Sequence, residues 1–386
     1  MHIKKVRQLD ICFLVVIVAF AFDFGNIKYV LAWVFSVFCL LLARRNNIKK
    51  INHIGKEYLF IAIGFLALFV ITLFFQLKNG FNSYAINEAV YDFTPLLFAF
   101  SYTQVSKKDN IEDVMNYSFA IFTIAFLKTF ITQLTIENIM SLSFTDSYSP
   151  FESELAFIFL VFECYFLFKS KKKFALISLI LCVLSFKRIC MLFAILFFVF
   201  SGWLTKDKKV DKKVVITATV FFVLLPVVTC SILNNSFESW FYSQFGISLH
   251  EATLSRSSRI EMVMNSGQIK YGLGSVTTYM TKALNDMHGS NYLNRSLHND
   301  LVQIYLECGI VGSSILTYVY MKATSFNRTT FILMCYIFVE CYFNHLFGAG
   351  TAQIWILIYL LFAFIDMTTN KINEIELNRR AVSWKE

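Results

Sequence analysis

The chain has 386 residues, of which 57% are hydrophobic and only 16% are charged, with a mean hydropathy of +0.59. This composition excludes a soluble globular enzyme, in which roughly a quarter of the residues are charged. The net charge of +9 does not indicate nucleic-acid binding, because the cations lie mainly in alternate connectors between apolar runs, as membrane topology requires.

Apolar runs of membrane-spanning length recur from Leu9 to Ile365, separated by short basic connectors. Because only helices and closed barrels satisfy their own backbone groups in lipid, we predict an all-α, polytopic membrane protein, with residues 1–386 as a single integral membrane domain. At roughly 20 apolar residues per span, the chain has about 12 transmembrane helices. After a first span that begins at Leu9, the predicted spans are 29–43, 58–77, 84–102, 114–134, 151–168, 174–186, 189–204, 214–233, 298–321, 329–347 and 351–365.

Basic connectors orient these spans. Lysine and arginine cluster after the second, fourth, sixth and eighth spans, and the positive-inside rule places such connectors in the cytoplasm. By parity, both termini are cytoplasmic. The longest polar segment, 234–297, is then a large outer loop between helices nine and ten. The hairpin of Lys187 and Arg188, between spans seven and eight, lies on the same outer side.

A minority of the cations falls on the outer side, against the topological bias. Cations kept there indicate an anionic partner, and guanidinium groups match phosphate oxygens through paired hydrogen bonds. For those in the long loop, solvated surface charge is the alternative. The outer cations are Lys28, Lys78, Lys128, Lys187, Arg188, Arg256, Arg259, Lys270, Lys282 and Arg295.

Two ionisable residues, Asp92 and Lys128, lie at similar depth inside predicted spans four and five. Intramembrane charges of this kind either pair or line a polar cavity. Both interpretations stay open for Lys128. The rival partners for Lys128 are Glu88, Glu152, Glu154 and Glu163.

The nine cysteines all lie in or beside apolar runs, and the six histidines are dispersed. Buried thiols behave as small hydrophobes, so we expect no disulfide framework. We also expect no metal and no cofactor. The sequence Gly272-Leu273-Gly274 lacks the context of a dinucleotide fingerprint and indicates a turn.

The stretch from Ser296 to Gly312 joins a polar segment to an apolar helix. With Ser296 as cap, His298 falls in the first helical turn, where the positive helix end favours a neutral imidazole. Gly309 and Gly312 then lie near the same face as His298 and permit close helix packing. Glu307 lies on the opposite side, and we favour an internal hydrogen-bond partner there over a catalytic acid.

Three motifs together resemble the O-antigen polymerase and O-antigen ligase superfamily of bacterial inner-membrane glycosyltransferases. In chain order they are Ser185-Phe186-Lys187-Arg188; Ser258-Arg259 followed by Gly272-Leu273-Gly274; and Leu297-His298-Asn299 with Leu301, Glu307, Gly309 and Gly312. Val263 and Tyr271 depart from the family pattern, which often has tryptophan and proline at these places, so Arg256 remains an alternative to Arg259.

The resemblance implies a GT-C-like helical fold that transfers a glycan from an undecaprenyl-diphosphate donor at the periplasmic face, without a metal. It implies three catalytic candidates, Arg188 and Arg259 for the leaving diphosphate and His298 for the attacking sugar hydroxyl. His298 acts as a base or only positions the acceptor. The candidate substrate-binding residues are Lys187, Arg256, Asn299, Lys128 and Tyr292.

Three functions follow. We favour a polymerase of O-antigen or another surface polysaccharide, because the Lys187-Arg188 doublet and His298-Asn299-Asp300 look more like that branch. A ligase that passes the glycan to the lipid A-core of lipopolysaccharide is the alternative, and a lipid-linked glycan transporter or flippase is the third. Expected partners are the undecaprenyl-diphosphate-linked oligosaccharide, membrane lipid, a chain-length regulator and a flippase.

Overall fold

The computed structural model describes residues 8–45, 50–80, 94–95, 97–99, 101–106, 108–141, 149–204, 209–234, 237–253, 256–267, 272–288, 297–325 and 327–344. Every regular element that has bounds within these ranges is an α-helix. The predicted span 351–365, most of 84–102, the candidate site residue Tyr292 and the ion-pair candidate Asp92 lie outside the described residues.

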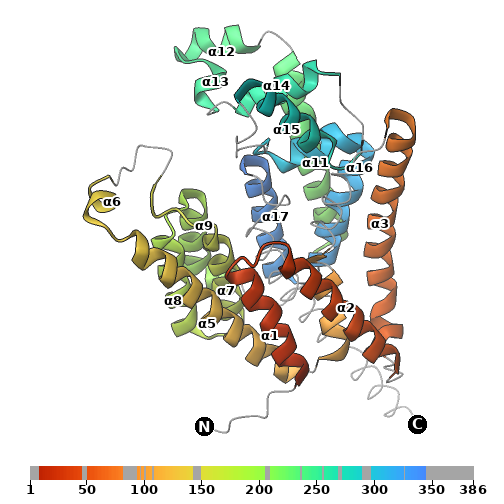
Figure 1. Cartoon of the computed structure of the whole chain (residues 1–386), viewed down its shortest axis with the longest axis vertical. Helices are drawn as coiled ribbons and strands as arrows, with labels where there is room; N and C mark the ends of the chain where they lie inside the picture. The colour runs from red at the N-terminus through yellow and green to blue at the C-terminus, as the bar shows by residue number, and fades with distance from the viewer. Residues whose placement is uncertain are drawn as a thin grey trace.

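Sixteen helices have defined bounds in the described part of the chain (Figure 1). They are α1 (Gln8–Ala21), α2 (Ile27–Arg45), α3 (Lys50–Asn79), α5 (Lys108–Gln133), α6 (Ile136–Met140), α7 (Leu155–Phe168), α8 (Lys172–Leu184), α9 (Arg188–Val199), α10 (Ser201–Leu204), α11 (Lys212–Asn234), α12 (Phe237–Phe245), α13 (Leu249–Ala252), α14 (Arg256–Asn265), α15 (Ser275–His288), α16 (Asp300–Thr324) and α17 (Arg328–Phe343).

Four of the described helices are long and apolar enough to cross a membrane, within α2, α5, α11 and α16. Shorter apolar helices include α1, α7 and α9. Large apolar side chains such as Val30, Leu66 and Phe221 are more than half exposed, as expected for surfaces that face lipid. These features are those of the predicted all-α membrane protein, while the number of twelve spans stays a prediction.

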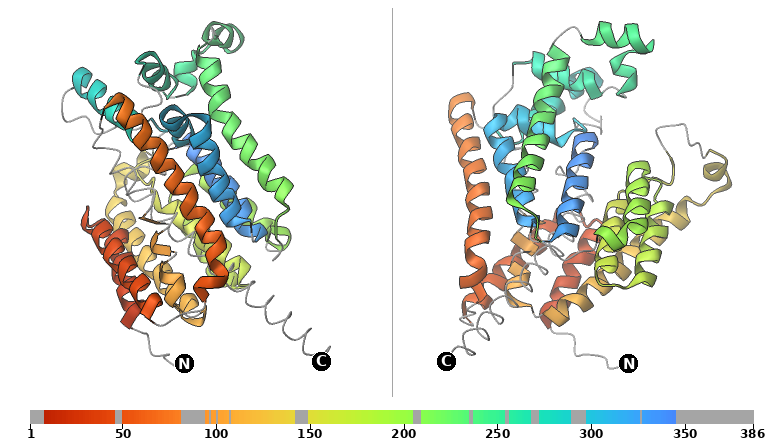
Figure 2. Two further views of the ribbon diagram at one scale, coloured as in Figure 1. Left: turned by 90° about the vertical axis from the view of Figure 1, so that its right-hand side faces the viewer. Right: turned by 180° about the vertical axis from the view of Figure 1, so that it is seen from behind.

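The helix α16 occupies the centre of the larger helix group. It packs against α3, α11 and α17, and 67% of its span is buried, compared with 33% for α11. Figure 2 shows α3, α16 and α11 running alongside one another. A second group forms where α7 packs on α8 and α9, and α5 packs on both α7 and α1.

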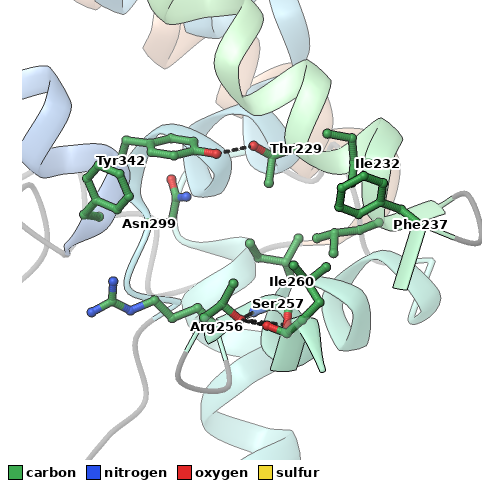
Figure 3. Close-up of a pocket in the computed structure, with 12 residues that line it drawn as sticks. Thr229, Ile232, Phe237, Arg256, Ser257, Ile260, Asn299 and Tyr342 are labelled. Carbon is green, nitrogen blue, oxygen red and sulfur yellow. Dashed lines mark hydrogen bonds between the residues drawn. The ribbon is translucent and has the colours of Figure 1, made fainter. Parts of the chain in front are cut away.

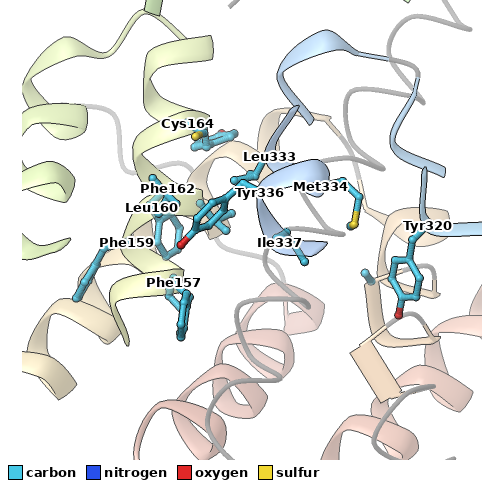
Figure 4. Packing of buried hydrophobic residues seen from close by; sticks show 14 of the residues in the cluster. Phe157, Phe159, Leu160, Phe162, Cys164, Tyr320, Leu333, Met334, Tyr336 and Ile337 are labelled. Carbon is cyan, nitrogen blue, oxygen red and sulfur yellow. The ribbon is translucent and has the colours of Figure 1, made fainter. Parts of the chain in front are cut away.

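The helix α17 joins the two groups through an apolar core. Leu160 and Phe162 of α7 lie near Leu333 and Ile337 of α17 in this core (Figure 4). Burial of such side chains, worth about 25 cal/mol per Å² of apolar surface, holds elements of the protein interior together. The start of α9 and the start of α16 are therefore fixed relative to each other through α17.

The segment predicted as a large loop carries four helices, α12 to α15, at one end of the bundle (Figure 1). We call this the loop end. The helices α11 and α17 finish there, α16 begins there, and the connection of α8 to α9 lies there as well. The side of the membrane on which the loop end lies stays a prediction.

The helix α16 is interrupted at Gly309, whose backbone has φ 68° and ψ −174°. A side chain there would be strained, because this region of conformational space is essentially restricted to glycine. The predicted alignment of His298, Gly309 and Gly312 on one continuous helix face is therefore wrong. Gly312 still lies close to a neighbouring helix, since a Cβ added there would be 3.5 Å from Leu68 of α3.

We expect the Gly309→Ala substitution to lower the free energy of unfolding by about 1–3 kcal/mol, because alanine cannot adopt this backbone conformation without strain. Thermal unfolding of the purified protein in detergent measures the change. Gly202→Ala is the matched control, since a Cβ at Gly202 meets open space. Equal unfolding temperatures for the two variants would contradict the role of Gly309.

Candidate functional site

The start of α16 differs from the predicted one. Asp300 is the first helical residue, and the cap is Asn299, whose side-chain oxygen accepts a hydrogen bond from Val302 N at 3.0 Å. His298 precedes the cap with φ 55°, so it does not lie in the first helical turn, and its predicted position at the positive helix end is wrong. The physical reason is that the Asn299 side chain satisfies the helix end one residue after His298. Ser296, the predicted cap, lies outside the described residues.

Glu307 anchors the loop-end helices to the bundle. Its Oε1 atom accepts hydrogen bonds from Val276 N in the first turn of α15 at 3.1 Å and from Gln303 Nε2 at 3.3 Å. Its backbone carbonyl accepts from Gly272 N at 2.9 Å. Glu307 is only 1% exposed. The preferred prediction, an internal hydrogen-bond partner, is confirmed.

The predicted turn at Gly272-Leu273-Gly274 is also confirmed, because both glycines have positive φ angles. A Cβ at Gly272 would lie 3.0 Å from the Cα atom of Thr72 in α3. Leu273 N donates to Thr72 Oγ1 at 3.3 Å. The turn therefore fits against α3 and α16 at close range, and this fit places α15 and the preceding α14.

A pocket of about 330 Å³ lies at the loop end, between α11, α12, α13, α14 and the ends of α16 and α17. Apolar side chains such as Ile232, Phe237 and Ile260 form part of its wall, and Arg256 and Asn299 supply polar groups. Figure 3 shows Arg256 and Asn299 on the side away from Ile232 and Phe237. The pocket can accept a molecule with an apolar part and an anionic part. We call it the loop-end pocket.

Arg256, at the start of α14, is the cation that lines the loop-end pocket. Partial burial and the neighbouring charge of Arg259 lower the pKa of Arg256 from its ordinary value, and the carboxylate of Glu340 acts in the opposite direction. An arginine so placed still carries its charge at neutral pH. The predicted alternative, Arg256 in place of Arg259, thus has the more direct access to the pocket.

The hairpin before α9 is held by its contacts with the start of α7. Lys187 Nζ lies 2.5 Å from Glu152 Oε1, and Ser153 N donates to the carbonyl of Ser185 at 3.0 Å. Arg188 is the first residue of α9 and is exposed. Lys187 is thus engaged by a carboxylate, while the guanidinium of Arg188 is accessible at the loop end.

A buried carboxylate, Glu340, lies in the last turn of α17, two residues before Tyr342 of the loop-end pocket. It is 1% exposed and accepts hydrogen bonds from Tyr336 Oη at 2.8 Å and from Asn344 Nδ2 at 2.7 Å. The charges of Lys187 and Arg256 both act on this carboxylate. Glu340 is thus held by two hydrogen bonds, while the nearest ion pair of the hairpin is that of Lys187 with Glu152.

Lys128 lines a second pocket, of about 340 Å³, between the ends of α1 and α5 and the start of α7. Glu152 and Glu154 share this pocket, and Lys128 Nζ lies 5.7 Å from the centroid of the Phe22 ring. Within the described residues, the Lys128 ammonium has no ion pair. Lys128 thus lines a pocket, while the predicted pair with Asp92 stays untested because Asp92 and Glu88 lie outside the described residues.

Glu163, another rival partner for Lys128, is fully buried in α7. Neither of its carboxylate oxygens has a hydrogen-bond partner among the described residues. Lys128, in contrast, is exposed near the end of α5. The two residues therefore do not pair.

The structure thus brings part of the predicted set together. Arg256 and Asn299 share a pocket, and the charge of Arg259 acts on Arg256, while Lys187 pairs with Glu152 at the hairpin. His298 is half-buried beside Asn299 but does not line the loop-end pocket.

Sequence reasoning missed two features of this end. Glu340 is an ionisable residue within a predicted span, and such residues are functional candidates by default. The sequence alone could therefore have identified Glu340 as a candidate. Tyr342 and Thr229, whose hydroxyls lie 2.6 Å apart at the pocket, carry no sequence signal, because their meeting depends on how α11 and α17 pack.

Comparison with known protein families gives one match. Residues 174–317 match the family model described as O-Antigen ligase. This match confirms the resemblance to the O-antigen ligase and polymerase superfamily over that part of the chain. The match includes Lys187, Arg188, Arg256, Arg259 and His298 and does not distinguish the polymerase from the ligase branch. No curated protein gives a significant match.

We expect Glu340→Leu to lower the free energy of unfolding by about 1–3 kcal/mol, because the buried Tyr336 hydroxyl loses its carboxylate acceptor. Glu340→Gln is the matched control, since its amide can hydrogen-bond to both Tyr336 and Asn344. Thermal unfolding in detergent compares the two. A leucine variant as stable as the wild type would show that these hydrogen bonds contribute nothing.

Proposed function

We propose that this protein is a polysaccharide polymerase, a glycosyltransferase that moves a growing glycan from undecaprenyl diphosphate onto the next lipid-linked repeat unit. The observation that carries the proposal is the O-antigen ligase family domain at 174–317. Within that domain, Arg256 lines a largely apolar pocket and acts on Glu340 together with Lys187. Such a site suits a lipid that ends in an anionic group.

The charge of the leaving group accounts for the cations at the loop end. When the bond between the anomeric carbon and the diphosphate oxygen breaks, the diphosphate keeps the electron pair and gains negative charge. Preorganised cations stabilise such charge in the transition state. We assign this role to Arg188 and Arg256, with Arg259 placed one helical turn after Arg256. Lys187 supports the hairpin that carries Arg188.

The attacking group is a sugar hydroxyl of the acceptor, which forms the new bond to the anomeric carbon and releases its proton. His298 is the candidate to take that proton or to hold the hydroxyl in position. Its left-handed backbone, with φ 55°, directs the chain into the cap at Asn299. The acceptor would approach from the side of the pocket formed by the start of α16.

In this proposal, the apolar wall of the loop-end pocket receives the first isoprenoid units of the carrier, and Asn299 receives a polar group of the substrate. Lys128 and its pocket contact the saccharide, and Tyr292, outside the described residues, stays a candidate substrate-binding residue. The loop end faces the periplasm, both termini face the cytoplasm, and the protein resides in the bacterial inner membrane. A chain-length regulator and a flippase remain proposed partners.

A ligase that transfers the glycan to the lipid A-core is the second candidate, favoured by the description of the matched family itself. Both reactions release the same carrier diphosphate and differ only in the acceptor. A transporter, the third candidate, would form no new glycosidic bond.

The acceptor separates these functions. We expect purified full-length protein, given lipid-linked repeat units alone, to make a ladder of lengthened glycans, detected by gel electrophoresis. Products formed only when lipid A-core is added would identify a ligase. If neither acceptor gives a new glycosidic bond, the enzymatic assignment is wrong.

Substitutions at the site test the assigned roles. We expect Arg256→Ala and Arg188→Ala to lower kcat by about 10²- to 10³-fold, as for the loss of one transition-state donor. We expect His298→Gly and His298→Asn to lose activity as well. Because glycine and asparagine both tolerate a positive φ, such a loss is due to the missing imidazole and not to backbone strain.

Lys282→Gln is the control for these variants, since Lys282 is an exposed cation of α15 outside the loop-end pocket. Its chain-length distribution should match that of the wild type. Full-length polymer from the Arg188, Arg256 and His298 variants alike would remove the proposed mechanism.

A further inference from the structure

A basic pocket of about 790 Å³ lies at the end of the bundle opposite the loop end, where α11 and α17 begin. The 23 residues of α11 rise about 35 Å along the helix, so this pocket is far from the candidate site. We call it the far-end pocket.

The far-end pocket carries an excess of positive charge. Its lining includes Lys209, Lys212 and Arg328, and the one carboxylate in that lining belongs to Asp211. Asp211 Oδ1 already accepts a hydrogen bond from Lys213 N at 2.8 Å. Within the described part of the chain, no carboxylate lies within ion-pair distance of Lys212 or Arg328. The charge of the pocket therefore suits an anion from outside the described chain.

The guanidinium of Arg328 and the backbone around the pocket are held in place. The guanidinium carbon of Arg328 lies 4.1 Å from the centroid of the Trp203 ring, a cation–π contact that orients the planar group. Val210 N donates to the carbonyl of Ser325 at 2.9 Å, which ties the start of α11 to the turn before α17. Lys212 and Arg328 are the first residues of α11 and α17, where the helix dipoles add further positive potential.

The surroundings are those of a membrane interface. Trp203 is 55% exposed, and tryptophan is enriched at the headgroup level, where one part of the ring is apolar and its N–H is polar. Val214, the third residue of α11, is half-exposed. Phe331 and Ile332 extend the apolar side of the pocket. A charged entrance above an apolar floor fits a phosphate that carries a hydrocarbon chain better than a free phosphate.

We propose that the far-end pocket binds the headgroup phosphate of an anionic phospholipid. The phosphate oxygens lie between Lys212 and Arg328, and an acyl chain follows the apolar side chains at the start of α11. Basic pockets between membrane helices bind anionic lipids in this way. The site is independent of the proposed transferase reaction, because it shares no residue with the loop-end pocket.

The test uses full-length protein, purified in detergent and stripped of lipid. Phosphatidylglycerol, phosphatidylethanolamine and inorganic phosphate are added separately, and binding is followed by native mass spectrometry and by the shift in unfolding temperature. We expect phosphatidylglycerol to bind most tightly. Lys212→Gln and Arg328→Gln should each weaken its binding about fivefold, the effect of one cation near a membrane surface.

Lys173→Gln is the matched control, because Lys173 is an exposed lysine in the first turn of α8 and lies outside the far-end pocket. It should leave lipid binding unchanged. Arg328→Lys keeps the charge and should retain more binding than Arg328→Gln. If Arg328→Gln does not fold, Lys212→Gln at an exposed position carries the test.

Three results would overturn the proposal. Equal binding of phosphatidylethanolamine would show that the anionic headgroup is not recognised. Equal protection by inorganic phosphate would show a site for soluble anions. Equal loss of binding in Lys173→Gln and Lys212→Gln would show that general surface charge attracts the lipid.

Discussion

The arrangement of the loop end depends on one buried carboxylate, Glu307. Its side chain accepts a hydrogen bond from the first turn of α15, and its carbonyl accepts from Gly272. A carboxylate at a helix N-terminus is stabilised by the unpaired backbone N–H groups and the helix dipole. Glu307 lies two residues before Gly309, where the regular conformation of α16 is interrupted. The loop-end helices therefore attach to α16 next to this interruption. The position of α14, and so of Arg256, follows from this attachment.

Charge compensation is the second constraint. Arg256 and Arg259 are near enough for the charge of one to lower the pKa of the other, and Lys187 brings a third cation from the hairpin before α9. Lys187 pairs with Glu152, which lies just before α7, and the charge of the Glu340 carboxylate favours the charged form of Arg256. Each acid comes from a different part of the chain from the cation on which it acts. The site can therefore hold positive charge in readiness for an anionic substrate without driving the helices apart.

The helices α11 and α17 contribute to a pocket at each end of the bundle, and the two pockets are lined by different kinds of residue. At the loop end these helices finish, and the pocket there combines Arg256 with apolar residues of α11 and α12. At the other end they begin, with Lys212 and Arg328 as their first residues beside Trp203. The apolar side chains between these ends suit the interior of a bilayer. A single pair of helices thus links a proposed reaction site to a proposed lipid contact.

The sequence by itself determined the all-α membrane class, the position of the large segment between two spans, the family and the turn at Gly272-Leu273-Gly274, because these depend on local composition and spacing. Glu307 as an internal hydrogen-bond partner was also within reach of local reasoning, whereas the sequence analysis placed the helix cap at Ser296 and not at Asn299. Only the tertiary structure decided that His298 lies before the helix, that Gly309 interrupts α16 and that the Tyr342 and Thr229 hydroxyls meet at the loop-end pocket. These features arise from packing between helices far apart in the chain, and a short-range pattern contains no record of such contacts.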